Sequence, residues 1–213
     1  GLKDAAGDGI TDDTDALNKA LNHSNCVIDG GNRRYKYVHL IMENVENVTV
    51  QNVVFWQGEA LDVRGCKNIR FQNCRWEEIK AASEKSTTWT NGIKLMERKD
   101  AAGTEIWSEN IWIENCVFYD IDFNHNINIK PWGPCGNEIS GQAIVPRSVH
   151  NLFVKHNFFS QTKGNAAIHW NTYKKCGYAE ITDNLFFLTG FGGVCVFAVT
   201  QQFKKVKGKI SNN

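Results

Sequence analysis

Several features that would settle the class of a protein are missing from this sequence of 213 residues. No run of 18 apolar residues occurs, so the chain lacks the continuous segment that a membrane-spanning helix requires. Nothing at Gly1 resembles a signal peptide, and the start looks cut rather than natural. An excess of one charge is also missing, because the net charge is +1. Neither nucleic acid nor insertion into a membrane is therefore expected.

Signals for hairpins and for metal sites are scarce as well. The dipeptide Asn-Gly, which marks tight hairpins, occurs only at Asn91-Gly92, and this argues against an antiparallel sandwich. The seven cysteines include no CxxC pair, and neither 124–126 nor 135–137 matches a metal-binding spacing. We expect no metal and no other cofactor.

A repeated phrase is present instead. Two short alternating segments meet at an asparagine or its equivalent, and the second ends on a large aromatic residue. Clear copies occupy residues 47–55, 68–76, 110–118 and 151–159, and weaker copies occupy 179–186 and 206–213. Their corners fit a basic unit of about 21 residues that carries insertions, which is typical of a solenoid.

A third alternating segment precedes each phrase, at residues 60–63, 92–95, 143–145, 167–170 and 194–197. Three short strands in each unit, stacked about 4.8 Å apart, predict an all-β fold: a right-handed parallel β-helix built of three-strand coils. Stacked corners should form an amide ladder of Asn52, Asn73, Asn115, Asn184 and Asn212. An aromatic column should form inside from Phe55, Trp76, Phe118, Phe159 and Phe186.

The first residues differ from the repeats. Thr11 is followed by two aspartates and by apolar residues at helical spacing, which predicts a capped amphipathic helix with Thr11 as N-cap. We therefore divide the chain into residues 1–24, with a short capping α-helix, and residues 25–213, the β-helix. Because the last coil is unfinished, the sequence is expected to be a fragment of a longer protein.

The opening also carries a family likeness. Gly7-Asp8-Gly9-Ile10-Thr11-Asp12-Asp13-Thr14-Asp15-Ala16-Leu17 closely resembles the G-D-G-x-T-D-D-T-x-A-[IL] start of the pectate-lyase-like superfamily, which has the pectin lyase fold. That start begins many bacteriophage tailspikes and pre-neck appendages, and also polygalacturonases and related polysaccharide enzymes. The resemblance implies the fold and says little about the reaction.

The enzyme motifs of that superfamily are not carried over. The N-T-D, D-D, G-H-G and R-I-K motifs of polygalacturonases are not found on the predicted coils. Residues 112–116 resemble the W-I-D-H-C strand of pectate lyases, but Glu114-Asn115 replaces Asp-His and no R-x-P-x-x-R follows. Neither reaction can be transferred residue by residue.

Cys74 and Cys116 occupy the same place in consecutive repeats. This predicts reduced, structural cysteines in the core, which suits a protein made in a reducing compartment.

One candidate site lies on the wall formed by the first strand of each unit. Alternation there turns Leu61, Ile93, Ile144 and Ile168 inward, and turns outward Asp62, Lys94, Val145 and His169. A polysaccharide lyase needs a base that removes a proton next to a uronic carboxylate, and cations that neutralise this carboxylate. Lys94 or His169 could be the base, with Arg64 or Lys130 as neutraliser. The alternative is that these are ordinary solvated residues of a sheet face.

A glycosidase would need two carboxyl groups, about 5 Å apart for retention or about 6.5 to 9.5 Å apart for inversion. Glu78 and Asp120 hold matching places after their aromatic residues, so stacking could bring them near the shorter spacing. Asp120 and Asp122, two apart on one strand, would lie near the longer one. Acidic residues are common in loops, however, so the alternative is that these three carboxylates have no catalytic role.

Insertions flank the first-strand wall, and long loops on a rigid solenoid usually carry binding. Aromatic residues in or beside them can stack on sugar rings. The predicted substrate contacts are Asp62, Arg64, Lys130, Trp132, Trp89 and Tyr173.

These patterns favour a phage tailspike that binds, and by expectation depolymerises, a bacterial surface polysaccharide as a glycosidase or a lyase. By resemblance it would be a homotrimer in the virion. Two alternatives stay open: a secreted microbial polysaccharide lyase or hydrolase, and a noncatalytic β-helical adhesin or shaft.

Overall fold

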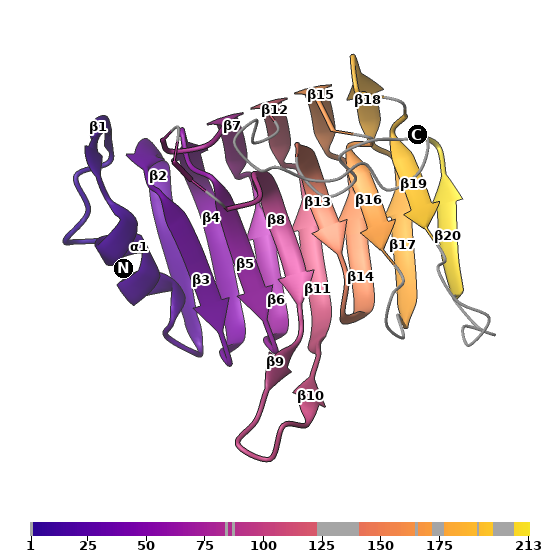
Figure 1. The fold of residues 1–213 in the computed structure, drawn as a ribbon, viewed down its shortest axis with the longest axis horizontal. Helices are drawn as coiled ribbons and strands as arrows, with labels where there is room; N and C mark the ends of the chain where they lie inside the picture. The colour runs from indigo at the N-terminus through magenta and orange to yellow at the C-terminus, as the bar shows by residue number, and fades with distance from the viewer. Residues whose placement is uncertain are drawn as a thin grey trace.

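The computed structural model describes residues 2–83, 85–86, 88–122, 141–164, 166–171, 177–190, 192–197 and 207–213. Figure 1 shows a row of parallel strands with one helix at the N-terminal end. A 12-stranded and a 6-stranded parallel sheet account for nearly all of the regular structure. The predicted all-β fold with parallel sheets and one helix is therefore confirmed at this level.

The six-stranded sheet forms what we call the first ladder. Its spatial order follows the order of the chain, and every neighbouring pair is parallel. The strands are β3 (His39–Glu43), β5 (Ala60–Arg64), β8 (Asn91–Met96), β13 (Gln142–Pro146), β16 (Ile168–Asn171) and β19 (Val194–Phe197).

The 12-stranded sheet contains two further ladders, which are joined because β4 pairs with both β6 and β7. The second ladder begins with the first halves of β2 (Cys26–Lys36) and β4 (Glu46–Trp56), and continues through β6 (Lys67–Gln72), β11 (Ser108–Glu114), β14 (Val149–Lys155), β17 (Tyr178–Thr182) and β20 (Lys207–Ser211). The third ladder begins with their second halves and continues through β7 (Arg75–Ile79), β12 (Val117–Ile121), β15 (Phe158–Thr162) and β18 (Leu185–Phe187).

The register of the ladders stacks equivalent residues of successive repeats. In the third ladder, Phe55 pairs with Trp76, Trp76 with Phe118, and Phe118 with Phe159. Neighbouring rings in this row stack with centroids 4.7 to 5.0 Å apart, and the row ends at the partly buried Phe186. The predicted aromatic column is confirmed.

The corner between the second and third ladders differs in part from the prediction. The residues with positive φ on this corner are Asn52, Asn73, Asn115, His156, Asp183 and Asn212. Asn184 was wrongly included, because it lies one position further on, where it is buried and bonds to the backbone carbonyl of Val154. Among the described residues, no hydrogen bond joins the side chains of Asn52, Asn73 and Asn115, so the expected amide ladder is wrong at these positions.

A continuous amide ladder instead runs along the corner that precedes the second ladder. In each rung the Nδ2 of one asparagine donates to the Oδ1 of the asparagine in the repeat before it, at 2.8 to 2.9 Å. All of its members have positive φ, between 54° and 59°. They are Asn25, Asn47, Asn68, Asn110 and Asn151. Asparagine tolerates this left-handed conformation better than most residues, and its amide supplies both a donor and an acceptor.

The helix begins later than predicted. α1 spans Thr14–Leu21, whereas Thr11 lies in β1 (Asp8–Asp12) and donates its hydroxyl to Asp8 Oδ2 at 2.9 Å. The prediction of Thr11 as N-cap is therefore wrong. Asp13 precedes the helix, but its buried carboxylate accepts hydrogen bonds from two backbone N–H groups of the preceding loop, at 2.6 and 3.0 Å.

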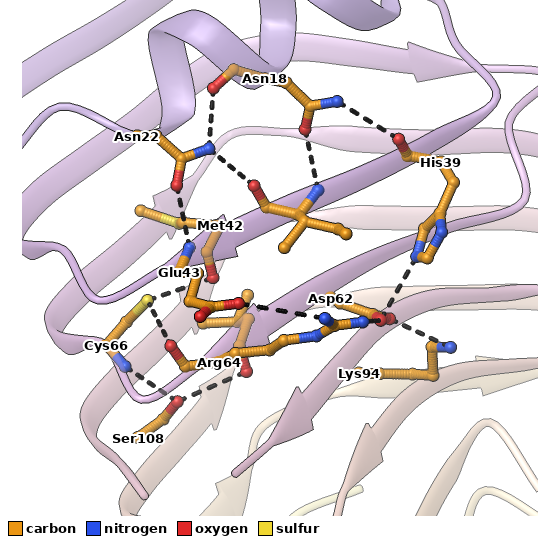
Figure 2. A network of polar contacts seen from close by, with 12 residues as sticks. Asn18, Asn22, His39, Met42, Glu43, Asp62, Arg64, Cys66, Lys94 and Ser108 are labelled. Carbon is orange, nitrogen blue, oxygen red and sulfur yellow. Dashed lines mark hydrogen bonds and ion pairs between the residues drawn. The ribbon is translucent and has the colours of Figure 1, made fainter. Parts of the chain in front are cut away.

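The helix covers the outer edge of β3 with polar side chains. Asn18 Oδ1 accepts from the N–H of Ile41 at 2.9 Å, and Asn22 Oδ1 accepts from the N–H of Glu43 at 3.0 Å. The Nδ2 of Asn22 donates to the carbonyl of Ile41 at 2.7 Å (Figure 2). Because residues four apart share one helix face, these amides satisfy the strand where a neighbouring strand would otherwise do so.

The cysteines at positions 26, 66, 74 and 116 are free, and Cys66, Cys74 and Cys116 are buried. Burial, followed by the neighbouring Cys74, raises the pKa of the Cys116 thiol well above its ordinary value. The expectation of reduced core cysteines is confirmed for Cys74 and Cys116.

The insertion after β8 contains a small antiparallel hairpin, β9 (Arg98–Lys99) and β10 (Glu105–Ile106). Within the described part of the chain, no helix is long and apolar enough to cross a membrane.

The amide ladder yields a stability prediction. Replacing Asn68 by glycine keeps the left-handed backbone without strain, but removes one donated and one accepted hydrogen bond, each worth about 1 kcal/mol. We expect Asn68→Gly to lower the free energy of unfolding by about 1 to 2 kcal/mol in denaturant titrations. Asn73→Gly is the matched control, since Asn73 has nearly the same φ of 55° and no side-chain bond among the described residues. Equal losses in the two variants would contradict a stabilising role of the ladder.

Candidate functional site

The predicted first-strand wall brings together several candidate residues. Asp62 pairs with Lys94 in register, and Lys94 pairs with Val145. His169 lies one strand further along, in β16, whose Ile168 pairs with Ile144. These outward-turned residues are buried, with Asp62 and His169 each only 2% exposed. They are therefore not the ordinary solvated residues of a sheet face.

Asp62 lies at the centre of a cluster of basic side chains (Figure 2). Arg64 Nη2 donates to its Oδ2 at 2.6 Å, and Lys94 Nζ lies 3.0 Å from its Oδ1. His39 Nε2 is 3.3 Å from Oδ2. We call Asp62, His39, Arg64 and Lys94 the Asp62 cluster. The carboxylate is almost fully enclosed, whereas the Arg64 and His39 side chains keep 29% and 26% of their surface exposed.

Burial alone would raise the pKa of the Asp62 carboxyl. The hydrogen bond from His39, the charge of Lys94 and the hydrogen bond from Arg64 outweigh this effect and hold that pKa far below its ordinary value. Asp62 is thus an anion at neutral pH and cannot serve there as a general acid. Arg64 and Lys94 are the two fixed cations beside this carboxylate, and Arg64 also lies 3.9 Å from the more exposed Glu43.

The residues of the cluster are held in place from two sides. His39 belongs to β3, whose backbone is bonded by α1, and the Asn18 amide reaches the carbonyl of His39 at 3.4 Å. Arg64 lies on β5, and its Nη1 is 3.9 Å from Glu43 Oε2 on the neighbouring strand. These contacts fix where His39 and Arg64 point, which reduces the cost of ordering them around a ligand.

The predicted acidic group lies on the other side of the repeat, at the end of the third ladder. Glu77 pairs with Tyr119 and Ile79 with Ile121, so Glu78 and Asp120 occupy matching positions as expected. Both have positive φ, 53° and 54°. The separation of their carboxyl groups stays a prediction.

These carboxylates are engaged by neighbouring side chains. Gln57 Nε2 donates to Glu78 Oε2 at 2.9 Å. Lys163 Nζ lies 3.2 Å from Asp120 and 3.1 Å from Asp122. Burial lowers the pKa of Lys163, but the hydrogen bonds and charges of Asp122 and Asp120 prevail and raise it above its ordinary value. One ammonium group therefore engages both carboxylates, whereas the general acid of a glycosidase must be free to give a proton to the glycosidic oxygen.

The remaining predicted contacts are less informative. Trp89 is half-buried just before β8, and no described contact links its ring to the Asp62 cluster. Lys130, Trp132 and Tyr173 lie outside the described residues. Among the residues that the structure does describe, no group of three or more His, Cys, Asp or Glu side chains could hold a metal ion.

His39 and Lys163 were missed in the sequence. His39 begins an alternating segment, His39-Leu40-Ile41-Met42-Glu43, that could have been aligned with residues 60–64 as a first copy of the wall. That alignment places Glu43 beside Arg64, whereas His39 reaches Asp62 diagonally, across two residues.

No protein-family model matches the chain, and no curated protein matches its sequence. Among solved structures, one similar chain is a candidate glycosyl hydrolase from Parabacteroides merdae ATCC 43184. The TM-score is 0.41 and the sequence identity 9%, over 86% of this chain and 90% of that one. A similarity at this level carries no argument about activity.

The Asp62 cluster predicts a dependence of stability on pH. Replacing Asp62 by asparagine leaves the buried ammonium group of Lys94 without its carboxylate, and we expect it to lower the free energy of unfolding by about 3 kcal/mol near neutral pH. This is the low end for buried pairs, because Arg64 and His39 keep contact with solvent. Asp29→Asn, at an exposed carboxylate that accepts hydrogen bonds from Gln51 and Asn52, is the control and should cost less.

The folded-state pKa of Asp62 is lowered, so its contribution is complete above the ordinary carboxyl pKa of 3.8 and is lost as the pH falls toward the folded value. The difference between parent and Asp62→Asn should therefore shrink between about pH 5 and about pH 2 in urea titrations. A difference that stays constant over this range would show that the carboxylate is not the stabilised species.

Proposed function

We propose that this chain binds an acidic bacterial surface polysaccharide through the Asp62 cluster and cleaves it by β-elimination. In this proposal the three ladders are the walls of a right-handed parallel β-helix, and the chain is part of a homotrimeric phage tailspike in the virion. The observation that carries the proposal is the enclosed Asp62 carboxylate, around which Arg64, Lys94 and His39 gather on the first ladder. The opening residues 7–17 and the absence of pectinase motifs on the coils support the tailspike assignment.

Elimination requires three chemical roles. Cations bind the uronate carboxylate and stabilise the negative charge that develops on it, a base removes the proton from the adjacent carbon, and the glycosidic oxygen leaves with the electron pair of its bond to the sugar. Arg64 and Lys94 suit the first role because their charges are fixed and partly accessible. Lys94 is less suited as base, because its Nζ is already engaged by the Asp62 carboxylate 3.0 Å away. His169, in the same outward row, is the better candidate for that role.

The glycosidase alternative keeps one supporting observation, the matching positions of Glu78 and Asp120. The ion pairs of Lys163 with Asp120 and Asp122 count against it. A secreted enzyme with the same chemistry, or a noncatalytic adhesin, would share the fold and differ in assembly or in product.

The decisive experiment is digestion of purified capsular polysaccharides, O-antigens and polygalacturonate, followed by size-exclusion chromatography and ultraviolet absorbance. We expect shorter chains from a uronate-containing polymer, with an absorbing unsaturated end that hydrolysis cannot produce. Shorter chains without this absorbance would replace the lyase by a hydrolase, and intact chains with retained binding would identify an adhesin.

Substitutions assign the roles. We expect Lys94→Gln and His169→Ala to lower the rate of elimination by about 10²- to 10⁴-fold. Lys67→Gln is the matched control and should act like the parent, since the one ion pair that Lys67 makes within the described residues is an exposed contact of 3.9 Å with Glu46 on the second ladder. Circular dichroism and unfolding midpoints of each variant separate loss of chemistry from loss of fold. Folded Lys94 and His169 variants with the parental rate would exclude this site.

A further inference from the structure

A second concave surface lies away from the Asp62 cluster, along the corner where the second ladder turns into the third. It is a groove of about 550 Å³ between β11 and β12, β14 and β15, and β17 and β18. The chain bends at each repeat because Asn115, His156 and Asp183 adopt left-handed φ values of 54°, 57° and 59°. We call this surface the corner groove.

One side of the corner groove is apolar. Val117 pairs with Phe158, and Phe158 pairs with Leu185, so the three side chains form one row across consecutive strands of the third ladder. Leu185 is 62% exposed, and the other two are partly exposed. An uncovered row of this kind offers apolar contact area that nothing in the described part of the chain occupies.

The other side of the corner groove is polar, and each repeat that supplies an apolar side chain also supplies a polar one. Asn115 and His156 are exposed, and within the described residues their side chains make no hydrogen bond. Asp183 accepts a hydrogen bond from Asn212 Nδ2 at 3.0 Å, and this bond, followed by one from Thr182, lowers the pKa of its carboxyl. The groove therefore presents an amide, an imidazole and an ionised carboxylate in successive repeats.

We propose that the corner groove is a noncatalytic binding site for a polysaccharide strand that lies along the stacking direction of the repeats. A sugar ring has an apolar C–H face and a rim of hydroxyl groups, and each repeat supplies one apolar side chain and one polar side chain that can match them. The lining repeats at the strand spacing of about 4.8 Å, which is close to the advance of one sugar unit along an extended glycan.

The lining makes other occupants less suitable. The core of a subunit interface is depleted of charged residues, whereas the corner groove carries a carboxylate and an imidazole along its length. Nucleic acid would require a basic surface, and here Asp183 contributes negative charge. The uncharged sugar units of a polymer that carries its uronates at intervals satisfy both sides of the groove, whereas the uronate units suit the Asp62 cluster.

The proposal rests on the proposed function for the class of ligand, but it assigns a different task to a different ladder. The Asp62 cluster lies on the first ladder, and none of its members lines the corner groove. Two contacts on one polymer raise its effective concentration at the cleavage site, so the groove would increase affinity for long chains and leave short fragments unaffected.

The test uses the full-length protein and the polysaccharide from the digestion panel that the parent binds most tightly. Asp183→Asn keeps a residue that tolerates positive φ, and Leu185→Ser changes an exposed side chain, so both variants should fold. We expect each to weaken binding of the long polymer by about 5- to 30-fold in affinity electrophoresis. The rate on short oligosaccharides from a parental digest should not change. Asp29→Asn and Val27→Ser are matched controls, since Asp29 is another exposed aspartate bonded to an asparagine amide and Val27 is 61% exposed.

Affinities equal to that of the parent in both groove variants would overturn the groove assignment and leave the proposed function standing. Variants that change the sedimentation coefficient without changing polymer binding would identify the groove as an interface between copies of the chain, which also overturns the proposal. If the parent binds no polysaccharide of the panel, the proposed function and the corner groove fail together.

Discussion

The stacking of left-handed corners in register is the constraint on which the rest of the structure depends. A residue with positive φ turns the backbone between ladders, and in each repeat the same position must tolerate that conformation. At the corner before the second ladder, the residues that adopt positive φ are asparagines, and their side-chain amides also form a row of hydrogen bonds from Asn25 to Asn151. Once the corners are aligned, each strand position faces its equivalent in the next repeat. The aromatic column and the outward row of the first ladder both result from this alignment.

The same alignment explains why the two candidate sites differ. In the first ladder, one row places an acidic residue, Asp62, beside a basic one, Lys94, so burial is compensated by an opposite charge. In the third ladder, the row contains two acidic residues, Glu78 and Asp120, which must find partners elsewhere. Gln57 and Lys163 supply them from the preceding and following repeats. A repeat protein thus builds a site from the sequence differences between otherwise equivalent positions.

The sequence was sufficient for those features that depend on periodicity. The spacing of Phe55, Trp76 and Phe118 predicts a stacked column, because residues with the same place in a repeat must stack if the strands are parallel. The amide ladder was predicted at the wrong corner, since both corners carry asparagines and only the side-chain direction separates Asn68 from Asn73.

The sequence did not predict features in which one side chain or backbone group can bond to several alternative partners. Thr11 has the pattern of an N-cap, but the Asp8 carboxylate accepts hydrogen bonds from both its hydroxyl and its backbone N–H, and the helix starts at Thr14. His39 was missed because its contact with Asp62 runs diagonally between strands. The burial of Asp62 and His169 also could not be derived from alternation, because alternation assigns a face of the sheet and not what covers that face.

The amides of Asn18 and Asn22 have a consequence for the behaviour of the protein in concentrated solution. An exposed parallel strand is a template onto which another polypeptide can add, and such additions can propagate into fibres. Because side chains of α1 already occupy the N–H and C=O groups of β3, a foreign strand would have to displace a covalently attached competitor. The helix thus acts as a built-in inhibitor of intermolecular sheet growth at this end of the first ladder.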